Sequence, residues 1–204
     1  MEGIILELQA NALDEKVSVE ELLRKAYLVA RKLQLSDFQK WIEDEQNGYN
    51  DKRVPEFRFI RGNYKALNPA RGWIPLMLSP KVEATISKMP TNFPLSQIEN
   101  IYEKSDGTMT FTPNAEIQQL LNQSIDFPID TAFSYHADSS EFYRILSTVR
   151  NKILEWSILL EENGITGQGL SFSDKEKEMA CKSERIIQYT NNIFGNIDNA
   201  SFTQ

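Results

Sequence analysis

Hydrophobic positions recur every three or four residues through the first part of the chain, which is the spacing of one face of an α-helix. A short amphipathic helix is predicted over residues 2–13. A second helix begins at the capping sequence Ser18-Val19-Glu20-Glu21, and a third begins at a similar sequence after Ser36 and ends at Asn47-Gly48. The pattern therefore predicts a three-helix N-terminal segment.

The pattern changes after Pro55. Aromatic and charged residues alternate over 57–60, which predicts a short strand, with Gly62-Asn63 as a turn and residues 64–67 as the returning strand of a hairpin. Prolines and glycines interrupt residues 68–80, so the apolar run from Trp73 to Leu78 is predicted to be irregular or an edge strand. Short helices over 80–88, 94–104 and 113–123 and a strand over 108–112 complete a mixed middle region.

The longest periodic segment begins at a capping sequence after Asp138 and ends at Gly164, which predicts a helix of about 25 residues. A polar helix is expected from Ser173, with a role in docking or oligomer formation. The expected fold class is α+β and predominantly α-helical: an N-terminal three-helix segment, a small β-hairpin in a mixed middle, and a long C-terminal helical hairpin. We expect one domain over 1–190 and an Asn-rich tail or linker over 191–204.

The composition is that of a globular protein, with 41% hydrophobic and 10% aromatic residues in a chain of 204. Such a chain buries enough surface to fold without a disulfide or a metal. The net charge of −7 disfavours nucleic acid and anionic membranes as general partners. The acidic start of the chain does not resemble a signal peptide, and one cysteine, Cys181, fits a reducing compartment, so we expect a cytoplasmic protein without a membrane partner.

The sequence lacks the residues that most catalytic mechanisms need. His136, expected in a loop just before the long helix, is the sole histidine, and Cys181 is the sole cysteine. Neither a zinc set nor a nucleophile with a separate base is therefore expected. The glycines of 164–169 follow a helix and lack the lysine of a phosphate-binding loop, which favours an ordinary connector. The sequence therefore predicts no catalytic residues, no metal and no cofactor.

One region combines aromatic residues with arginines, between Trp41 and Trp73. Arginine and aromatic side chains together suit base stacking, phosphate binding or a protein–protein hot spot. The candidate binding residues are Tyr49, Arg58, Arg61, Arg71 and Trp73. In the alternative interpretation, the aromatic side chains point into the core and the arginines into solvent.

Several strings along the chain resemble one known family. They are Glu45-Gln46-Asn47-Gly48-Tyr49, Pro55-Glu56-Phe57-Arg58, Arg71-Gly72-Trp73-Ile74-Pro75 and Arg150-Asn151-Lys152-Ile153-Leu154-Glu155-Trp156. On these strings the chain resembles the AbiTii domain, an N-terminal module of bacterial abortive-infection and other phage-conflict proteins, over nearly its whole length. Gln46 departs from the leucine expected in the first string. The resemblance implies a part in antiviral defence, and it transfers no catalytic residue.

Three hypotheses follow for the function. The first is a non-catalytic interaction, sensing or assembly module of an antiphage system, which binds a protein of that system or forms a homo-oligomer through the polar C-terminal helix and the region of aromatic residues and arginines. The second is a nucleic-acid-binding or nuclease-type module that uses Arg58, Arg61 and Arg71. The third is a toxin component that a partner completes, with Glu161 or Tyr49 taking part.

Overall fold

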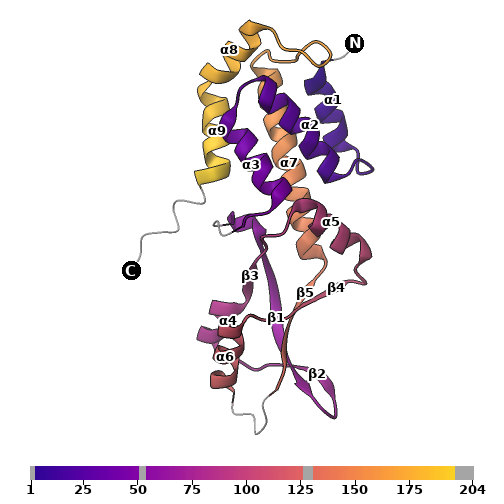
Figure 1. Cartoon of the computed structure of the whole chain (residues 1–204), viewed down its shortest axis with the longest axis vertical. Coiled ribbons are helices and arrows are strands. Elements are labelled where there is room, and N and C mark those ends of the chain that lie inside the picture. Colours follow the sequence, from indigo (N-terminus) through magenta and orange to yellow (C-terminus); the bar gives the residue numbers. More distant parts are fainter. Residues whose placement is uncertain (1–2, 51–53, 126–130, 196–204) are drawn as a thin grey trace.

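The computed structural model describes residues 3–50, 54–125 and 131–195, which form an elongated molecule with a helical part at one end and a sheet part at the other (Figure 1). The helical part consists of α1 (Ile4–Leu13), α2 (Val19–Lys32), α3 (Ser36–Asn47), α5 (Leu95–Lys104), α7 (Ser140–Glu162), α8 (Asp174–Lys182) and α9 (Glu184–Gly195). The sheet part consists of β1 (Phe59–Asn68), β2 (Gly72–Pro75), β3 (Lys88–Pro90), β4 (Thr108–Phe111) and β5 (Phe133–Asp138), with α4 (Pro80–Ile86) and α6 (Ala115–Ser124). The predicted α+β, mainly helical fold class is confirmed.

The long helix α7 is the centre of the helical part, and it packs against α1, α2, α5 and α9. Its buried face also carries Trp156, whose ring stacks on that of Phe38 from α3 with 3.9 Å between the ring centroids. Both rings are fully buried. Removing rings of this size from water contributes a few kcal/mol each, which fixes α3 against α7.

Arg150 joins the end of α1 to α7. Its guanidinium donates hydrogen bonds to the carbonyl oxygens of Asn11 (3.2 Å), Ala12 (3.4 Å) and Asp14 (3.1 Å), and also to that of Val17. The last carbonyls of a helix have no partner within the helix, so a cation placed there satisfies them and interacts favourably with the helix dipole. The arginine of the Arg-Asn-Lys string is therefore a structural residue.

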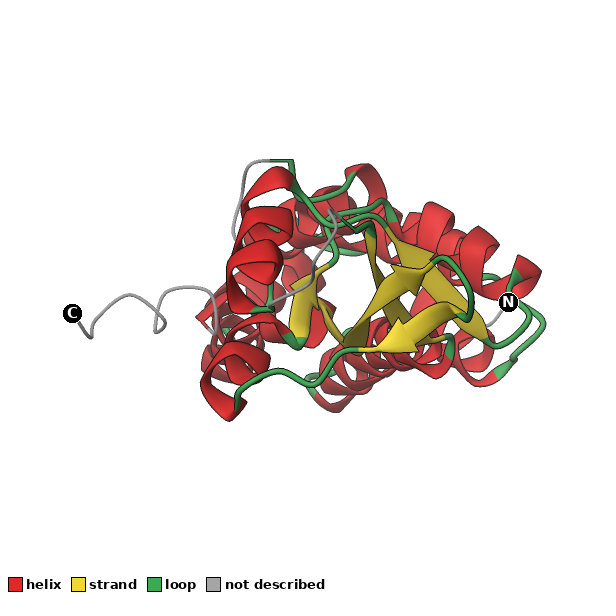
Figure 2. Ribbon diagram, turned by 90° about the horizontal axis from the view of Figure 1, so that it is seen from below, coloured by secondary structure: helices red, strands yellow, loops and turns green. Residues whose placement is uncertain are grey.

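The sheet is antiparallel, with strand order β2-β1-β5-β4, and β3 pairs with the start of β1. In β1 the alternate residues Ile60, Tyr64 and Ala66 are buried, and Tyr64 and Ala66 lie opposite Tyr135 and Phe133 of β5. This alternation is the two-residue period of a strand with one face in the core. Figure 2 views the twisted strands from the sheet end of the molecule.

The predicted turn at Gly62-Asn63 is wrong, because β1 runs through both residues without interruption. The hairpin turns instead after Asn68, whose side-chain oxygen accepts hydrogen bonds from the amides of Ala70 and Arg71. Glycine is required at position 62 for a steric reason, because a Cβ there would lie 2.7 Å from Cζ of Tyr135. The ring of Tyr135 packs directly against Gly62 of β1, and only a residue without a side chain leaves room for it.

Two further predictions need correction. Residues 133–138 form strand β5, so His136 lies within the sheet and not in a loop before the long helix. The polar C-terminal helix is two helices, α8 and α9, and α9 continues to Gly195, beyond the expected start of the tail at 191. Residues 196–204 of that tail lie outside the described part. The run from Trp73 to Leu78, predicted to be irregular or an edge strand, is divided: residues 73–75 belong to the edge strand β2, and residues 76–78 have no regular structure.

The connector between α7 and α8 is held by one carboxylate. Glu176 accepts hydrogen bonds from the amides of Thr166 (3.1 Å) and Gly167 (2.8 Å) and completes a capping box with Ser173. These bonds hold the pKa of Glu176 below its ordinary value, although partial burial opposes them. The backbone amides of the glycine-rich segment are therefore occupied by a carboxylate of the helix that follows, as is usual for an ordinary connector.

Candidate functional site

A cleft of about 450 Å³ lies where the helical part meets the sheet part. One wall is a polar face of α7, and the other is the segment that leads into β1. One residue each of β3 and α9 also contributes to its lining. The lining residues are Pro55, Glu56, Phe57, Phe59, Arg61, Lys88, Glu141, Arg144, Thr148, Lys152 and Ile193.

Arg144 fixes the two walls of the cleft to each other. From α7 its guanidinium donates to the carbonyl oxygens of Phe57 (3.1 Å) and Phe59 (2.6 Å), and it pairs with Glu141 at 3.1 Å. The carboxylate of Glu141 also accepts from the backbone amide of Arg61, at 3.0 Å. The entry of β1 is thus attached to α7 through a charged network, and the cleft has a defined shape.

Lys152 extends along the same wall, two helical turns after Arg144. Its ammonium lies 5.5 Å from the centroid of the Phe57 ring, a distance at which a cation is attracted to the ring face. Partial burial lowers the pKa of Lys152, while the charges of Glu155 and Glu45 act in the opposite direction. The lysine therefore lies partly desolvated at the edge of the cleft.

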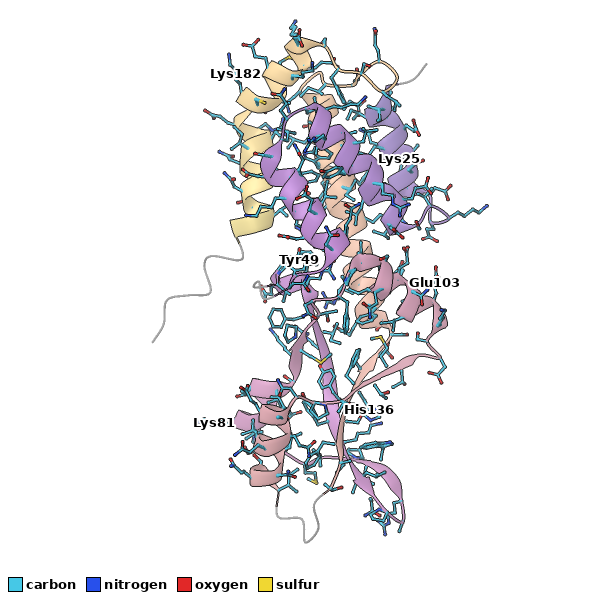
Figure 3. All side chains as sticks on the ribbon, viewed as in Figure 1. Lys25, Tyr49, Lys81, Glu103, His136 and Lys182 are labelled. Carbon is cyan, nitrogen blue, oxygen red and sulfur yellow. The ribbon has the colours of Figure 1, made fainter. Side chains whose placement is uncertain are left out.

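Behind the cleft, the end of α3 is joined to the turn before β1 by three buried polar groups. Arg58 forms an ion pair with Glu45, and both side chains are fully buried. The hydroxyl of Tyr49 donates to the other oxygen of the same carboxylate, at 2.5 Å, and the Arg58 guanidinium lies 5.1 Å from the Tyr49 ring centroid. Burial, with the charge of Glu45, raises the pKa of Tyr49 above its ordinary value. Figure 3 places Tyr49 at this junction.

These contacts take two of the candidate binding residues away from the surface. Arg58 also donates to the carbonyl oxygen of Phe93, at 3.1 Å, so its guanidinium is held from several sides. In the folded chain neither Arg58 nor Tyr49 is exposed to a ligand from solution. The expectation that arginines of this region point outward is therefore wrong for Arg58.

The other three candidates lie on two different surfaces. Arg61 lines the cleft, whereas Arg71 and Trp73 lie on the β1–β2 hairpin. Arg53, another arginine between Trp41 and Trp73, lies outside the described residues. The structure thus divides the predicted binding region into a buried cluster, a cleft residue and a hairpin surface.

The hairpin surface consists of Leu67, Arg71, Trp73 and Met77. Leu67 and Trp73 lie directly opposite each other on paired strands. Leu67 is 42% exposed and Trp73 is 43% exposed. Met77, just beyond β2, is 99% exposed. β2 is an edge strand of the sheet, so apolar side chains and strand-edge backbone occur together at this end of the molecule.

The two reactive side chains of the sequence lie far apart in the fold. His136 is on β5, next to the Trp73 ring, with 5.9 Å between centroids (Figure 3). Burial and then the charge of Lys65 lower its pKa. Cys181 is at the end of α8 in the helical part, where its thiol points to the carbonyl oxygen of Leu33 at 3.6 Å. Within the described ranges, no group of histidine, cysteine and acidic side chains has the arrangement of a metal site.

Six polar residues of the cleft were not among the candidates predicted from the sequence: Glu56, Lys88, Glu141, Arg144, Thr148 and Lys152. Residues 144, 148 and 152 recur every four residues, a spacing that places them on one helix face. A polar face of this kind is usually a solvated face, so the spacing alone did not indicate a site. The missing information was the packing of β1 against that face.

The fold and the cleft define an elongated α+β protein whose sheet part is attached to a helical part through α7 and β1. A comparison with family models matches residues 3–184 to the family described as AbiTii, and the chain belongs to this family. By its name, the family assigns the chain to abortive infection, a form of bacterial antiphage defence. No curated protein and no solved structure matches the chain. Among the described residues, no helix is long and apolar enough to cross a membrane.

Proposed function

We propose that the chain is a non-catalytic interaction module of an abortive-infection system and that it binds a protein of the same system through the hairpin surface. The observation that carries this proposal is the exposed cross-strand pair Leu67 and Trp73. Large apolar side chains that stay in solvent cost free energy in the isolated chain, and a contiguous group of them at one end of a molecule is typical of a contact site.

The chemistry of this surface suits a protein partner. Tryptophan and arginine are the side chains most enriched at binding hot spots, and Arg71 lies at the turn beside Trp73. The outer side of β2 offers backbone amide and carbonyl groups to which a strand of the partner adds, so main-chain hydrogen bonds give affinity and the Trp73 ring gives specificity.

Two arrangements weigh against the nucleic-acid alternative. Arg58 is buried with Glu45, and Arg61 and Arg71 lie on separate surfaces, so the three arginines do not form one phosphate-binding track. For the toxin alternative, Tyr49 is buried and Glu161 accepts a hydrogen bond from Gln9 at 2.8 Å, an exposed contact between α7 and α1. These contacts are structural, and they favour the interaction module.

The proposal is tested by co-purification. The tagged full chain is expressed with the other proteins of its own defence locus, and the complexes are analysed by size-exclusion chromatography with light scattering. We expect a complex, or a self-associated chain, that Trp73→Asp abolishes. Leu13→Asp is the matched control, because Leu13 is 71% exposed at the end of α1, on the helical part. A monomeric wild-type chain that binds none of these proteins, or a Trp73→Asp chain that still binds, would overturn the proposal.

A further inference from the structure

The cleft between α7 and β1 carries an excess of positive charge in a protein of net charge −7. Four cationic side chains line it, Arg61, Lys88, Arg144 and Lys152, against the two carboxylates of Glu56 and Glu141. Glu141 and Arg144 pair with each other, and Glu141 also accepts from the amide of Arg61, so the remaining charges are three cations, Arg61, Lys88 and Lys152, against Glu56. The cleft therefore attracts an anion.

Two of these cations face each other at close range. Arg61 of β1 and Lys88 of β3 are directly opposite partners in an antiparallel pair, so their side chains project from the same face. Both residues are exposed, and within the described residues neither side chain has an ion-pair or hydrogen-bond partner. Like charges in this position destabilise a strand pair, which an anion bound between them would offset.

The segment that leads into β1 also supplies a different kind of contact. Phe57 and Phe59 are half-buried and line the cleft beside Lys152 and Thr148. A half-buried aromatic ring binds a planar or apolar group, and cationic side chains bind phosphate oxygens. Because Arg144 is held by two backbone carbonyls, the two walls are fixed before the ligand arrives, so little conformational entropy is lost on binding.

The size of the cleft limits the ligand. A volume of about 450 Å³ lies within the ordinary range of small-molecule sites. Glu56 and Glu141 lie on the same lining as the cations, so the positive charge is confined to the cleft and does not continue as a track for a long polyanion. The combination favours one compact molecule that has both phosphates and an aromatic ring.

We propose that this cleft binds a free nucleotide, with its phosphates between Arg61 and Lys88 and its base on the wall of Phe57 and Phe59. The site is separate from the hairpin surface, so this inference goes beyond the proposed function. It gives the defence module a second, small-molecule input at the junction of its two parts.

Calorimetric titration of the purified full chain tests this inference, with three probes: ATP, tripolyphosphate and a short single-stranded oligonucleotide. We expect ATP to bind more tightly than tripolyphosphate, because the base adds a contact, and more tightly than the oligonucleotide. Raising the salt concentration weakens the binding. Arg61→Gln and Lys88→Gln each lower the affinity for ATP by about tenfold or more, since each removes a charge-assisted contact. Lys81→Gln, an exposed lysine of α4 outside the cleft, leaves the affinity unchanged.

Lys88→Glu separates binding from folding. It places a negative charge directly opposite Arg61 in the strand pair. We therefore expect a higher melting temperature than that of the wild-type chain, together with a loss of ATP binding. No heat of ATP binding at about 1 mM would overturn the inference. It would also be overturned by equal affinity for tripolyphosphate, by preference for the oligonucleotide, or by unchanged ATP affinity in both glutamine variants.

Discussion

Arg58 and Glu45 form an ion pair in which both side chains are fully buried, and this pair joins the C-terminal end of α3 to the turn that precedes β1. Taking two charges out of water is costly, and the pair is stable because Tyr49 and the carbonyl oxygen of Phe93 supply further hydrogen bonds. The pair is therefore a second attachment between the helical part and the sheet part, beside the network of Arg144 and Glu141 that joins the walls of the cleft.

Removing one member of this pair leaves the other charge buried without its partner. We expect Arg58→Met to lower the free energy of unfolding by about 3–5 kcal/mol, measured by urea denaturation. Arg71→Met, a matched change at an exposed arginine, should alter it by about 0.5 kcal/mol or less. A double variant with Glu45→Met as well should be more stable than the sum of the single losses indicates, because no uncompensated charge remains. An additive double variant would contradict the pairing.

Gly62 is expected to tolerate no side chain. A Cβ at this position would lie 2.4 Å from the carbonyl oxygen of His136 and 2.7 Å from the Tyr135 ring, so Gly62→Ala forces β1 and β5 apart. The hydroxyl of Tyr135 bonds to the carbonyl oxygens of Ile60 and Ser87, which prevents the ring from moving away. We expect a loss of about 1–3 kcal/mol in thermal or urea unfolding. Asn63→Ala, at the exposed next position of β1, is the control and should change stability little.

Arg150 is expected to be required for the order of the α1–α2 connection. Arg150→Gln removes the guanidinium that binds the carbonyl oxygens of residues 11, 12, 14 and 17. Amide hydrogen exchange over residues 11–18 should accelerate, and the chain should lose about 1.5–3 kcal/mol of stability. Arg150→Lys should not restore protection, because an ammonium cannot span the same carbonyls. Arg24→Gln, which breaks an exposed pair with Glu20, serves as the control. Unchanged exchange in Arg150→Gln would refute this role.

His136 gives a prediction for pH. Burial and the charge of Lys65 lower its pKa in the folded chain, whereas the unfolded chain titrates near the ordinary value of about 6.5. Between these two pKa values the unfolded chain binds more protons than the folded chain. The contribution of His136 to folding stability is therefore complete above about pH 6.5 and decreases as the pH is lowered through this interval. His136→Gln should remove this part of the pH dependence, measured as the difference in urea midpoint between the two proteins from about pH 7.5 to 5.5. Parallel profiles for both proteins would contradict it.

Periodicity predicted most of the helical part. The stripe of α2 and the long apolar face of α7 follow from spacing that depends on local sequence alone, and both helices are found where they were expected. The strand β5 was missed because its residues precede a strong helix signal, and its place in the sheet depends on pairing with β1, far away in the sequence. Gly62 was misread for the same reason, since the cause of the glycine is a ring from β5 and not a turn.

Residue type selected only some of the residues that form the cleft and the hairpin surface. Arg61 and Trp73 were selected from residue type, and the structure places both on surfaces that a ligand or a partner can reach. Arg58 and Tyr49 were selected by the same rule, yet they are buried, because a glutamate from α3 compensates the arginine. Residue type does not distinguish these cases. Lys88, Arg144 and Lys152 become a site only when β1, β3 and α7 meet.

The claim that this chain acts by contact through the hairpin surface is tested most directly by phage plating on a host that carries the complete native defence locus. We expect a Leu67→Asp and Trp73→Asp double variant to permit as many plaques as a strain without the gene, while the purified variant keeps the wild-type melting temperature. The Leu13→Asp control should protect fully. Full protection by the folded double variant would show that the hairpin surface is not the contact site.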